Sequence, residues 1–463
     1  MTATPLHQKL QPEFYLLVFL VSIGFFMQGL DTTIINTALP AMATSLQEHP
    51  LRMHGVVISY VLSVAACIPL SGWLADRFGV RNTFFAAIVI FTLASLGCAL
   101  SNDFNLLIAF RVLQGIGGAL LLPVGRLAML RIIPREQFLS AMSLMSLAGL
   151  MGPLMGPTLG GWLVEYASWH WIFLINLPIG LLGMFVTFKA MPNTTEPSVK
   201  KFDLSGFILL VIAMVGMALG IENIASREVS RSFSLGLFIT GFIAALIYAY
   251  HAHTHQNALF RSKLFRNRIY AIGILGNFFA RFGSNAIPFI LPLMLQVAFQ
   301  MEPFMTGIML TPMVLGSLFS KPIIRPMISK VGYRRLLLIN TFLVGACIAS
   351  FALTTADTPT WLRAVHFFVF GTLNSLQFVA MNTLTLKDLP QQDASSGNSF
   401  LSMIMMLSMS IGIALAGTLL NVFTNHLGEA QITQAFHYTL ICLGLINIIT
   451  AIIFYQIPKN QEI

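Results

Sequence analysis

The chain has 463 residues, of which 56% are hydrophobic and only 9% are charged, and its formal net charge is +9. In soluble proteins about a quarter of the residues are charged, so this composition excludes a chain whose main solvent is water. A soluble core this apolar would need helices with no face left for water. Stretches of about 20 apolar residues, long enough to cross a bilayer, instead follow one another along almost the whole chain. We therefore expect an all-α polytopic membrane protein.

The apolar stretches divide into fourteen predicted spans. The first begins at Phe14 and runs past Asp31 to Pro40 without a small-residue cleavage pattern, so we expect a retained span rather than a signal peptide. In chain order the spans form a block of six, a pair, and a second block of six. Their predicted ranges are 14–38, 53–72, 82–101, 105–125, 138–163 and 170–190, then 203–222 and 233–251, then 270–298, 304–323, 334–355, 360–384, 397–423 and 434–456.

Basic residues collect in alternate joints between the spans, which is typical of the cytoplasmic side of a membrane. These joints and the two ends of the chain hold 20 of the 26 lysines and arginines. We therefore expect both termini in the cytoplasm. The asymmetry accounts for the net charge, so a nucleic-acid partner is not expected. The 20 residues are Lys9, Arg77, Arg81, Arg126, Arg131, Arg135, Lys189, Lys200, Lys201, Arg261, Lys263, Arg266, Arg268, Lys321, Arg325, Lys330, Arg334, Arg335, Lys387 and Lys459.

An internal repeat links the two blocks of six spans. The joint after the second span reads Gly72-Trp-Leu-Ala-Asp76-Arg77-Phe-Gly79-Val-Arg81. A basic residue, a glycine and an arginine recur 253 positions later as Lys330, Gly332 and Arg334. The simplest interpretation is two homologous halves, residues 1–200 and 256–463, separated by two inserted helices within 201–255; a chance match between short basic turns is the alternative. Such repeats place a substrate cavity at their interface.

Asp31 is the only acidic residue predicted to lie well inside a span. A charged carboxylate there costs about 2.5–3.5 kcal/mol on insertion scales, so we expect Asp31 to face a cavity or a partner. Arg111 lies at a matched depth, roughly 10–14 Å below the outer surface, and is a candidate partner. Because burial and a nearby cation act oppositely on a carboxylate's charge, the pair suits proton uptake and release. The alternative is a structural polar residue bonded to neighbours such as Gln28.

The fifth span is rich in glycine and proline. Glycines spaced four residues apart share one helical face and permit close approach of a neighbouring helix, whereas each proline removes a backbone donor and bends its helix. We expect a kinked packing seam along this face. Its residues are Gly152, Pro153, Gly156, Pro157 and Gly160.

Arg281 falls near the middle of the ninth span and is followed by Gly283-Ser284-Asn285 and then Pro288. Interrupted helices often line transport cavities, so we interpret Arg281 as a cavity residue. A snorkelling or purely structural arginine is the alternative. Asn277 and Gln296 could supply neutral hydrogen bonds in the same cavity.

No residue pattern predicts catalysis, a metal or another cofactor. The four cysteines lie in predicted spans without paired spacing. His251, His253 and His255 alternate in a basic joint, where a solvated loop is favoured over a metal site. The sequence contains neither His-Glu-x-x-His nor Gly-x-Ser-x-Gly. We therefore do not expect an enzyme.

Together these motifs resemble those of the major facilitator superfamily, and specifically its fourteen-span drug:proton antiporter branch. The segment from Gly72 to Arg81 resembles the loop signature of the whole superfamily, in which the aspartate, here Asp76, is held against a helix N-terminus of the opposite half and the basic residues form inner-gate ion pairs. The segment from Leu106 to Gly118 resembles the fourth-helix motif whose arginine is tied to proton transfer, and the segment from Gly152 to Gly161 resembles the fifth-helix motif of exporters. The segments from Leu30 to Pro40 and from Trp169 to Gly180 resemble two motifs of the fourteen-span branch itself.

The resemblance implies a bacterial inner-membrane transporter of the major facilitator fold that exports small amphiphilic or toxic compounds in exchange for protons. It also implies proton coupling by Asp31 and Arg111 and rocking of the two halves around a central site. The later spans lack the additional acidic residues typical of exporters of divalent cations. A cavity with Asp31, Arg111 and Arg281 would be net positive. Import, or transport of a specific anionic or neutral metabolite, therefore remains the alternative, because the fold does not fix direction or substrate. The expected partners are a small-molecule substrate, protons and the lipid bilayer.

Overall fold

The computed structural model describes residues 11–196, 201–224, 229–255 and 257–458. Within them, fourteen helical segments are long and apolar enough to cross a membrane. Both the predicted number of spans and their grouping as six, two and six are confirmed. Three of the basic residues used to predict orientation, Lys9, Lys200 and Lys459, lie outside the described residues.

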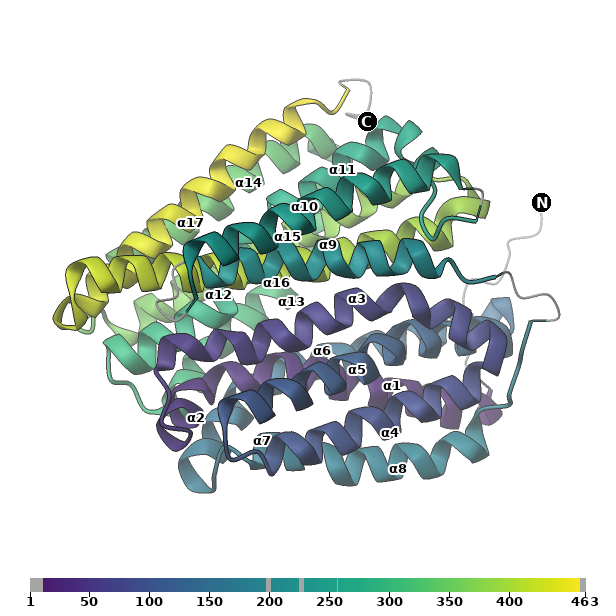
Figure 1. Ribbon diagram of the computed structural model, residues 1–463, viewed down its shortest axis with the longest axis horizontal. Helices are drawn as coiled ribbons and strands as arrows, with labels where there is room; N and C mark the ends of the chain where they lie inside the picture. The colour runs from purple at the N-terminus through teal and green to yellow at the C-terminus, as the bar shows by residue number, and fades with distance from the viewer. Residues whose placement is uncertain (1–10, 197–200, 225–228, 256, 459–463) are drawn as a thin grey trace.

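Two six-span halves and an inserted pair of helices make up the molecule (Figure 1). The N-terminal half contains α1 (Pro12–Ile34), α2 (Leu39–Ser45), α3 (His54–Phe78), α4 (Val80–Ala99), α5 (Phe104–Ile132), α6 (Arg135–Tyr166), α7 (Trp171–Leu174) and α8 (Asn176–Ala190). The inserted pair is α9 (Leu204–Asn223) and α10 (Arg231–Thr254). The C-terminal half contains α11 (Arg268–Phe279), α12 (Phe282–Leu293), α13 (Pro303–Val331), α14 (Tyr333–Ser350), α15 (Thr360–Lys387), α16 (Gln391–Leu427) and α17 (Ile432–Tyr455).

Several helices are longer than the predicted spans. Helix α5 ends at Ile132 and α13 at Val331, whereas the predicted spans stop at 125 and 323. Hydropathy detects only the part of a helix that suits the hydrocarbon core. The added turns carry basic residues such as Arg131 and Lys330 beyond that core.

The repeated basic segment forms a tight turn in each half. Helix α3 continues through Phe78 and α4 begins at Val80, so the joint predicted from the sequence shrinks to Gly79. Gly79 has φ +89° and ψ 152°, and Gly332, between α13 and α14, has φ +78° and ψ 160°. Glycine adopts this positive-φ region without a steric penalty, which explains why glycine recurs at both positions. We call the end of the molecule that holds these turns the inner end, and the opposite end the outer end.

Several polar contacts between the two halves lie at the outer end. The Gln296 side chain donates to the Thr37 carbonyl at 2.9 Å, and the Phe304 backbone N–H donates to Glu165 at 3.1 Å. The Thr158 hydroxyl donates to the Gly307 carbonyl at 3.3 Å. The helix pairs that carry the interface are α6 with α13 and α3 with α16. These hydrogen bonds therefore join the two halves at the outer end.

The inserted pair lies across the seam between the halves in Figure 1. Helix α9 packs on α10, on α16 of one half and on α3 of the other. Its first turn is tied to the end of α10 by His251, whose Nε2 lies 2.9 Å from Asp203. His251 is buried in α10, which continues to Thr254, so the prediction of a solvated histidine loop is wrong at this residue. The predicted span 233–251 is shorter than α10 because the last turn of the helix is polar in sequence.

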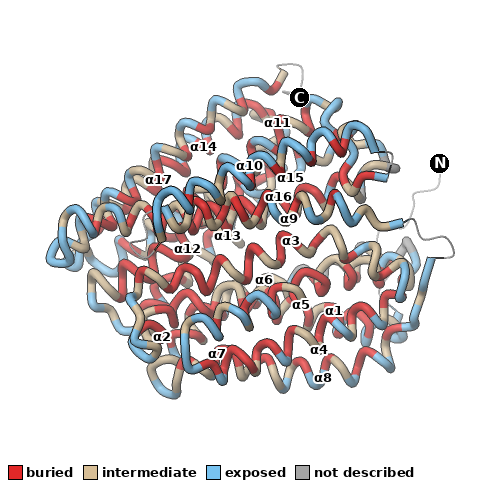
Figure 2. The backbone as a smooth tube through the Cα atoms, in the orientation of Figure 1, coloured by how far each residue is buried: buried red, intermediate tan, exposed pale blue. Residues whose placement is uncertain are grey.

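The outward faces of the spanning helices are exposed (Figure 2). Large hydrophobic side chains are exposed on both halves and on the inserted pair, among them Phe185, Leu246 and Ile452 at 62%, 57% and 67%. Exposed apolar area on this scale is typical of a surface that faces lipid or a partner. Together with the length of the helices, it identifies a multi-pass membrane protein.

Candidate functional site

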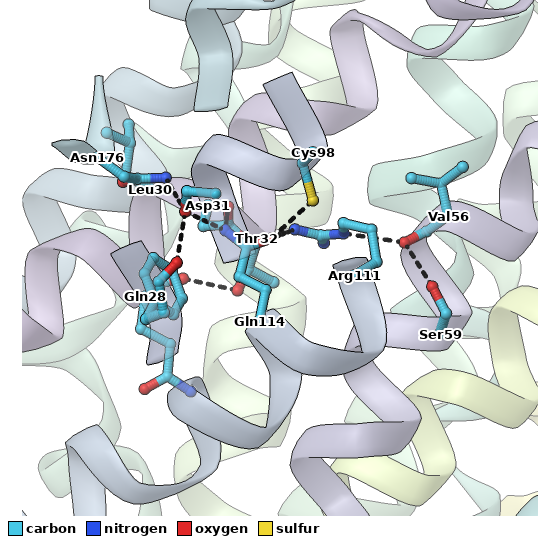
Figure 3. Close-up of polar contacts among 12 residues, drawn as sticks. Gln28, Leu30, Asp31, Thr32, Val56, Ser59, Cys98, Arg111, Gln114 and Asn176 are labelled. Carbon is cyan, nitrogen blue, oxygen red and sulfur yellow. Dashed lines mark hydrogen bonds and ion pairs between the residues drawn. The ribbon is translucent and has the colours of Figure 1, made fainter. Parts of the chain in front are cut away.

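The structure brings Asp31 and Arg111 together inside the N-terminal half. Arg111 Nη1 donates to Asp31 Oδ2 at 2.7 Å, and the side chains are 0% and 1% exposed, respectively. The guanidinium also donates through Nε to the Val56 carbonyl at 3.1 Å and lies 4.2 Å from the Tyr60 ring centroid. The three helices α1, α3 and α5 thus meet at one buried ion pair (Figure 3).

Gln114 connects the two members of this pair. Its amide nitrogen donates to Asp31 Oδ1 at 2.8 Å, while its oxygen accepts from Arg111 Nη1 at 2.6 Å. The same nitrogen also contacts the Ser95 hydroxyl at 2.8 Å. Both oxygens of Asp31 therefore accept hydrogen bonds, which offsets part of the cost of burying its charge.

Glycines on α5 make this arrangement possible. A Cβ added at Gly115 would lie 2.6 Å from the Tyr60 carbonyl oxygen, and one at Gly118 would lie 2.8 Å from the Tyr60 hydroxyl. Only a helix without side chains at these positions can approach α3 so closely. The close approach lets the Arg111 guanidinium reach the backbone of α3.

Gln28 does not contact the Asp31 carboxylate. Its carbonyl accepts a hydrogen bond from the Thr32 hydroxyl at 2.7 Å, and its side-chain oxygen is buried without a hydrogen-bond partner. The residue that shares the carboxylate is Gln114, one turn along α5 from Arg111, because a helix places residues three apart on one face.

A second buried arginine lies in the C-terminal half. Arg281 is 5% exposed and occupies the break between α11 and α12. Its Nε donates to Asn277 Oδ1 at 3.0 Å and its Nη2 to Asn382 Oδ1 at 3.2 Å. The guanidinium also lies 4.3 Å from the Phe378 ring centroid. Among the described residues, no carboxylate lies within 4.0 Å of it.

The structure separates Gln296 from Arg281 and Asn277. Gln296 lies in the π-helical segment Met294–Ala298 that follows α12, where it bonds to Thr37 of the other half. Asn277 lies in the last turn of α11, one turn before Arg281, which occupies the break. Gln296 therefore belongs to the outer interface, since twelve residues of α12 separate it from the break.

The glycine face of α6 packs against α1. A Cβ added at Gly152 would meet the backbone nitrogen of Leu30 at 2.6 Å, and one at Gly160 the Ile34 carbonyl at 2.5 Å. At Gly156 it would collide with the Thr33 hydroxyl. Helix α6 runs through Pro153 and Pro157 as one element. The seam thus holds the helix that carries Asp31.

Comparison with known proteins decides the family. The sequence model of the family described as Major Facilitator Superfamily matches residues 21–412 and 273–462 of the chain. The chain belongs to the Major Facilitator Superfamily. It is therefore a membrane transporter by family rather than an enzyme, and the resemblance predicted from the motifs is confirmed.

Among this family's members, the chain is 49% identical over 450 residues to the "Putative multidrug resistance protein MdtD" of Salmonella newport (strain SL254) and to the protein of the same name from Salmonella typhi. Each alignment covers 96% of this chain and 95% of the relative. Solved structures share the fold at low identity. A D-xylose-proton symporter matches with a TM-score of 0.69 at 14% identity, covering 97% of this chain and 99% of its own. The human organic anion transporter MFSD10 matches with a TM-score of 0.59 at 14% identity, covering 96% and 100%.

The superfamily signature at the inner end differs from the family expectation. Asp76 accepts a hydrogen bond from Arg131 of its own half at 2.6 Å, and Arg131 also donates to Glu196 at 2.9 Å. Arg77 and Arg81 lie over the rings of Trp73 and Phe188 at 5.4 and 5.6 Å. Gly72 has no atom within 4 Å of an added Cβ. In the part of the chain that the structure describes, the side-chain contacts of Asp76 lie within the N-terminal half, at the end of the molecule opposite the contacts of Gln296 and Phe304 between the halves.

Two polar residues of this superfamily member were missed by the sequence reasoning. Gln114 could have been found from its spacing of three residues from Arg111. Glu222 ends its predicted span, so it was not counted as buried, yet its side chain is only 17% exposed. Its Oε1 lies 3.6 Å from His54 Nε2, across the contact between α9 and α3. An acidic residue in the last turn of an otherwise apolar span was the available signal.

Proposed function

We propose that this transporter exports small amphiphilic or toxic compounds in exchange for protons, and that Asp31 is the group that binds the proton. The observation that supports this most strongly is the ion pair of Asp31 and Arg111, fully buried within the N-terminal half. An ionisable pair inside the membrane is a functional candidate because its burial is costly. The relatives named as multidrug resistance proteins support export.

Protonation of Asp31 provides the switch in this proposal. A neutral Asp31 loses its ionic contact with Arg111, whereas Arg111 keeps the Val56 carbonyl, Gln114 and the Tyr60 ring. The helix α1 is then held less tightly to α5. Proton uptake thereby favours one conformation over another by the difference in their interactions.

A continuous chain of contacts connects this switch to the interface between the halves. Helix α1 packs on the glycine face of α6, and α6 packs on α13 of the C-terminal half. A Cβ added at Gly307 of α13 would collide with the Pro157 carbonyl. A shift of α1 is transmitted along this seam, so we assign Gly152, Pro153, Gly156, Pro157 and Gly160 to the coupling of proton uptake with rocking of the halves.

The proposal includes the orientation and the division of the chain. Both termini lie in the cytoplasm of a bacterial cell, and the basic turns at Gly79 and Gly332 form the cytoplasmic gate. The halves comprise residues 1–200 and 256–463 and rock relative to each other, and residues 201–255 are inserted between them. Gln28, Asn277 and Arg281 contribute to the substrate cavity, and Gln296 contributes at its outer end.

A second candidate function rests on Arg281. A buried guanidinium with amide partners and no carboxylate within 4.0 Å in the described residues leaves an uncompensated positive charge in the C-terminal half. This charge favours an anionic or neutral metabolite over a cationic drug. Import or export of such a metabolite uses the same proton site.

Everted membrane vesicles test the proposal. In vesicles with an acidic interior, the wild-type protein should accumulate an exported compound, and addition of that compound should dissipate the pH gradient. A screen of cationic, neutral and anionic compounds separates the two candidates. Asp31→Asn should lose both signals. A variant that retains substrate-dependent proton movement would contradict the role of Asp31, and accumulation only in right-side-out vesicles would identify an importer.

A further inference from the structure

A cavity of about 620 Å³ lies at the outer end of the C-terminal half, between α14 and α15. It is separate from the buried ion pair of the N-terminal half. Polar side chains occupy its outer end, where Arg363, His366 and Ser350 line it. Toward the middle of the membrane the lining becomes apolar, with Leu343 and Val369 among its residues.

Arg363 is the only cation other than histidine in this lining. It is 5% exposed, and its Nη2 donates to the carbonyls of Thr355 and Ala356 at 3.2 and 2.5 Å. Its Nε is buried without a hydrogen-bond partner. No carboxylate of the described residues lies within 4.0 Å of the guanidinium, although Asp357 of the same loop acts on it through space. A buried donor without an acceptor is costly, so the cavity offers Arg363 to an anion.

The neighbouring polar groups leave room for such an anion. His366 Nε2 and the Ser350 hydroxyl lie 2.8 Å apart, and the His366 ring packs on Phe351 with a centroid distance of 4.1 Å. Neither residue bonds to Arg363. The His366 and Ser350 side chains are therefore bonded to each other, the donors at the polar end of the cavity come from Arg363, and the lining contains no acidic residue.

The apolar part of the cavity opens toward the membrane. Leu343 on α14 and Val365 and Val369 on α15 are 42%, 52% and 42% exposed, and both helices span the bilayer. At about 1.5 Å per residue, Val369 lies about 9 Å below Arg363, and Leu373 lies about 15 Å below it. The cavity thus changes from cationic to apolar over the depth at which a phospholipid changes from headgroup to acyl chain.

We propose that this cavity binds an anionic phospholipid of the outer leaflet, with its phosphate on Arg363 and one acyl chain between α14 and α15. Arginine suits phosphate because its planar donors match the phosphate oxygens. The lipid, rather than free phosphate, is favoured by the apolar groove beneath the arginine. A headgroup without an amine is favoured because the lining holds no carboxylate to receive one.

Lipid binding to the purified full-length protein tests this proposal. Native mass spectrometry after delipidation would count bound phosphatidylglycerol for wild type, Arg363→Gln and the control Arg231→Gln, which alters an exposed outer-end arginine on α10. We expect Arg363→Gln to weaken binding about ten-fold, the loss typical of one charge-assisted hydrogen bond. The control should bind as the wild type does.

A second variant tests the acyl-chain site with Arg363 intact. Val369→Trp fills the apolar part of the cavity, so it should also weaken phosphatidylglycerol binding. In a separate comparison with the wild-type protein, phosphatidylcholine with the same acyl chains should bind more weakly than phosphatidylglycerol. Equal binding by the wild type and both variants would overturn the proposal. Equal affinity of the wild-type protein for inorganic phosphate and for phosphatidylglycerol would also overturn the proposal, because the apolar groove would then contribute nothing to binding.

Discussion

The two halves each bury an arginine in the membrane but satisfy it by different means. Arg111 of the N-terminal half pairs with a carboxylate at 2.7 Å, whereas Arg281 of the C-terminal half has two asparagine oxygens and an aromatic ring. The repeat offset of 253 residues places Arg281 opposite Gln28 rather than opposite Arg111. The halves therefore share a fold but not a polar site.

This difference suggests a division of labour. An ion pair can be switched by one proton, because protonating the carboxylate removes its charge. A guanidinium held by neutral amides keeps its charge throughout and can act only on what approaches it. On this account the N-terminal half exchanges the proton, and the C-terminal half presents a fixed cation to the substrate.

The largest expected effect separates the two arginines by stability. Arg111→Met leaves the Asp31 carboxylate buried without its cation, so we expect a loss of about 3–5 kcal/mol in unfolding free energy. Adding Asp31→Asn should restore much of that loss, since the unpaired charge is then removed. Chemical denaturation of the single and double variants in detergent measures this coupling. Strictly additive effects would show that the pair is not a stabilising unit.

The seam that holds α1 gives the next largest effect. At Gly152 an added Cβ would meet three backbone atoms of α1, at 2.6, 2.8 and 2.9 Å, and none of them can move cheaply. We expect Gly152→Ala to cost about 3 kcal/mol, at the upper end for overpacking, and to reduce coupled transport.

Gly236→Ala is the matched control for this seam, because an added Cβ at Gly236 of α10 meets nothing within 4 Å. It should be neutral or stabilising by up to about 1 kcal/mol. Thermal unfolding and proton-coupled flux should be recorded for both variants. Equal thermal stability and equal proton-coupled flux of the two variants would show that packing of α6 against α1 has no role in coupling.

A smaller effect is expected at the C-terminal arginine. Arg281→Met leaves the oxygens of Asn277 and Asn382 without a charged donor, which should cost about 2 kcal/mol. Arg281→Lys keeps the charge. If the fixed cation selects the substrate, transport of an anionic compound should fail in the methionine variant and persist in the lysine variant. Identical transport by both variants would argue against a role for this charge.

The smallest expected effect concerns the inserted pair. Burial raises the pKa of Asp203, but hydrogen bonds from Gly206, His251, Leu259 and Ser205 outweigh it, so the pKa lies below its ordinary value. Asp203 caps α9, and Asp203→Ala should cost about 1 kcal/mol at neutral pH. A lowered native pKa stabilises the fold above the unfolded value and loses that contribution as the pH falls. The wild-type advantage should therefore shrink below about pH 4.

Transport by the folded Asp203→Ala protein distinguishes packing from coupling. If the inserted pair only packs between the halves, proton-coupled flux per folded molecule should match the wild type. A selective loss of coupling without a loss of stability would assign the pair an active part, and Glu222 beside His54 would then be the first residue to examine.

Much of the fold could be predicted because a bilayer imposes its own pattern. Span length and the repeated basic segment were sufficient for the helix count and the grouping of the spans. Asp31 and Arg111 could be matched because depth follows directly from position along a helix. Gln28 and Gln296 could not be assigned in the same way. Their roles depend on which face of a helix meets which neighbour, and hydropathy does not contain that information.

Helix ends were the other source of error. The last turns of α3 and α10 are polar in sequence, so both were predicted as joints, although the two helices continue through them to Phe78 and Thr254. Glu222 was missed for the same reason at the end of α9. The polarity of a membrane boundary hides helical structure that hydropathy alone cannot recover.

The most direct test of the central claim is proton release by the purified protein in weakly buffered detergent. When a transported compound identified by the vesicle screen is added, wild-type protein should release protons, because substrate binding and protonation of Asp31 compete. The Asp31→Asn variant should bind the compound without releasing protons. Equal proton release by the two proteins would contradict the assignment of Asp31 as the coupling residue.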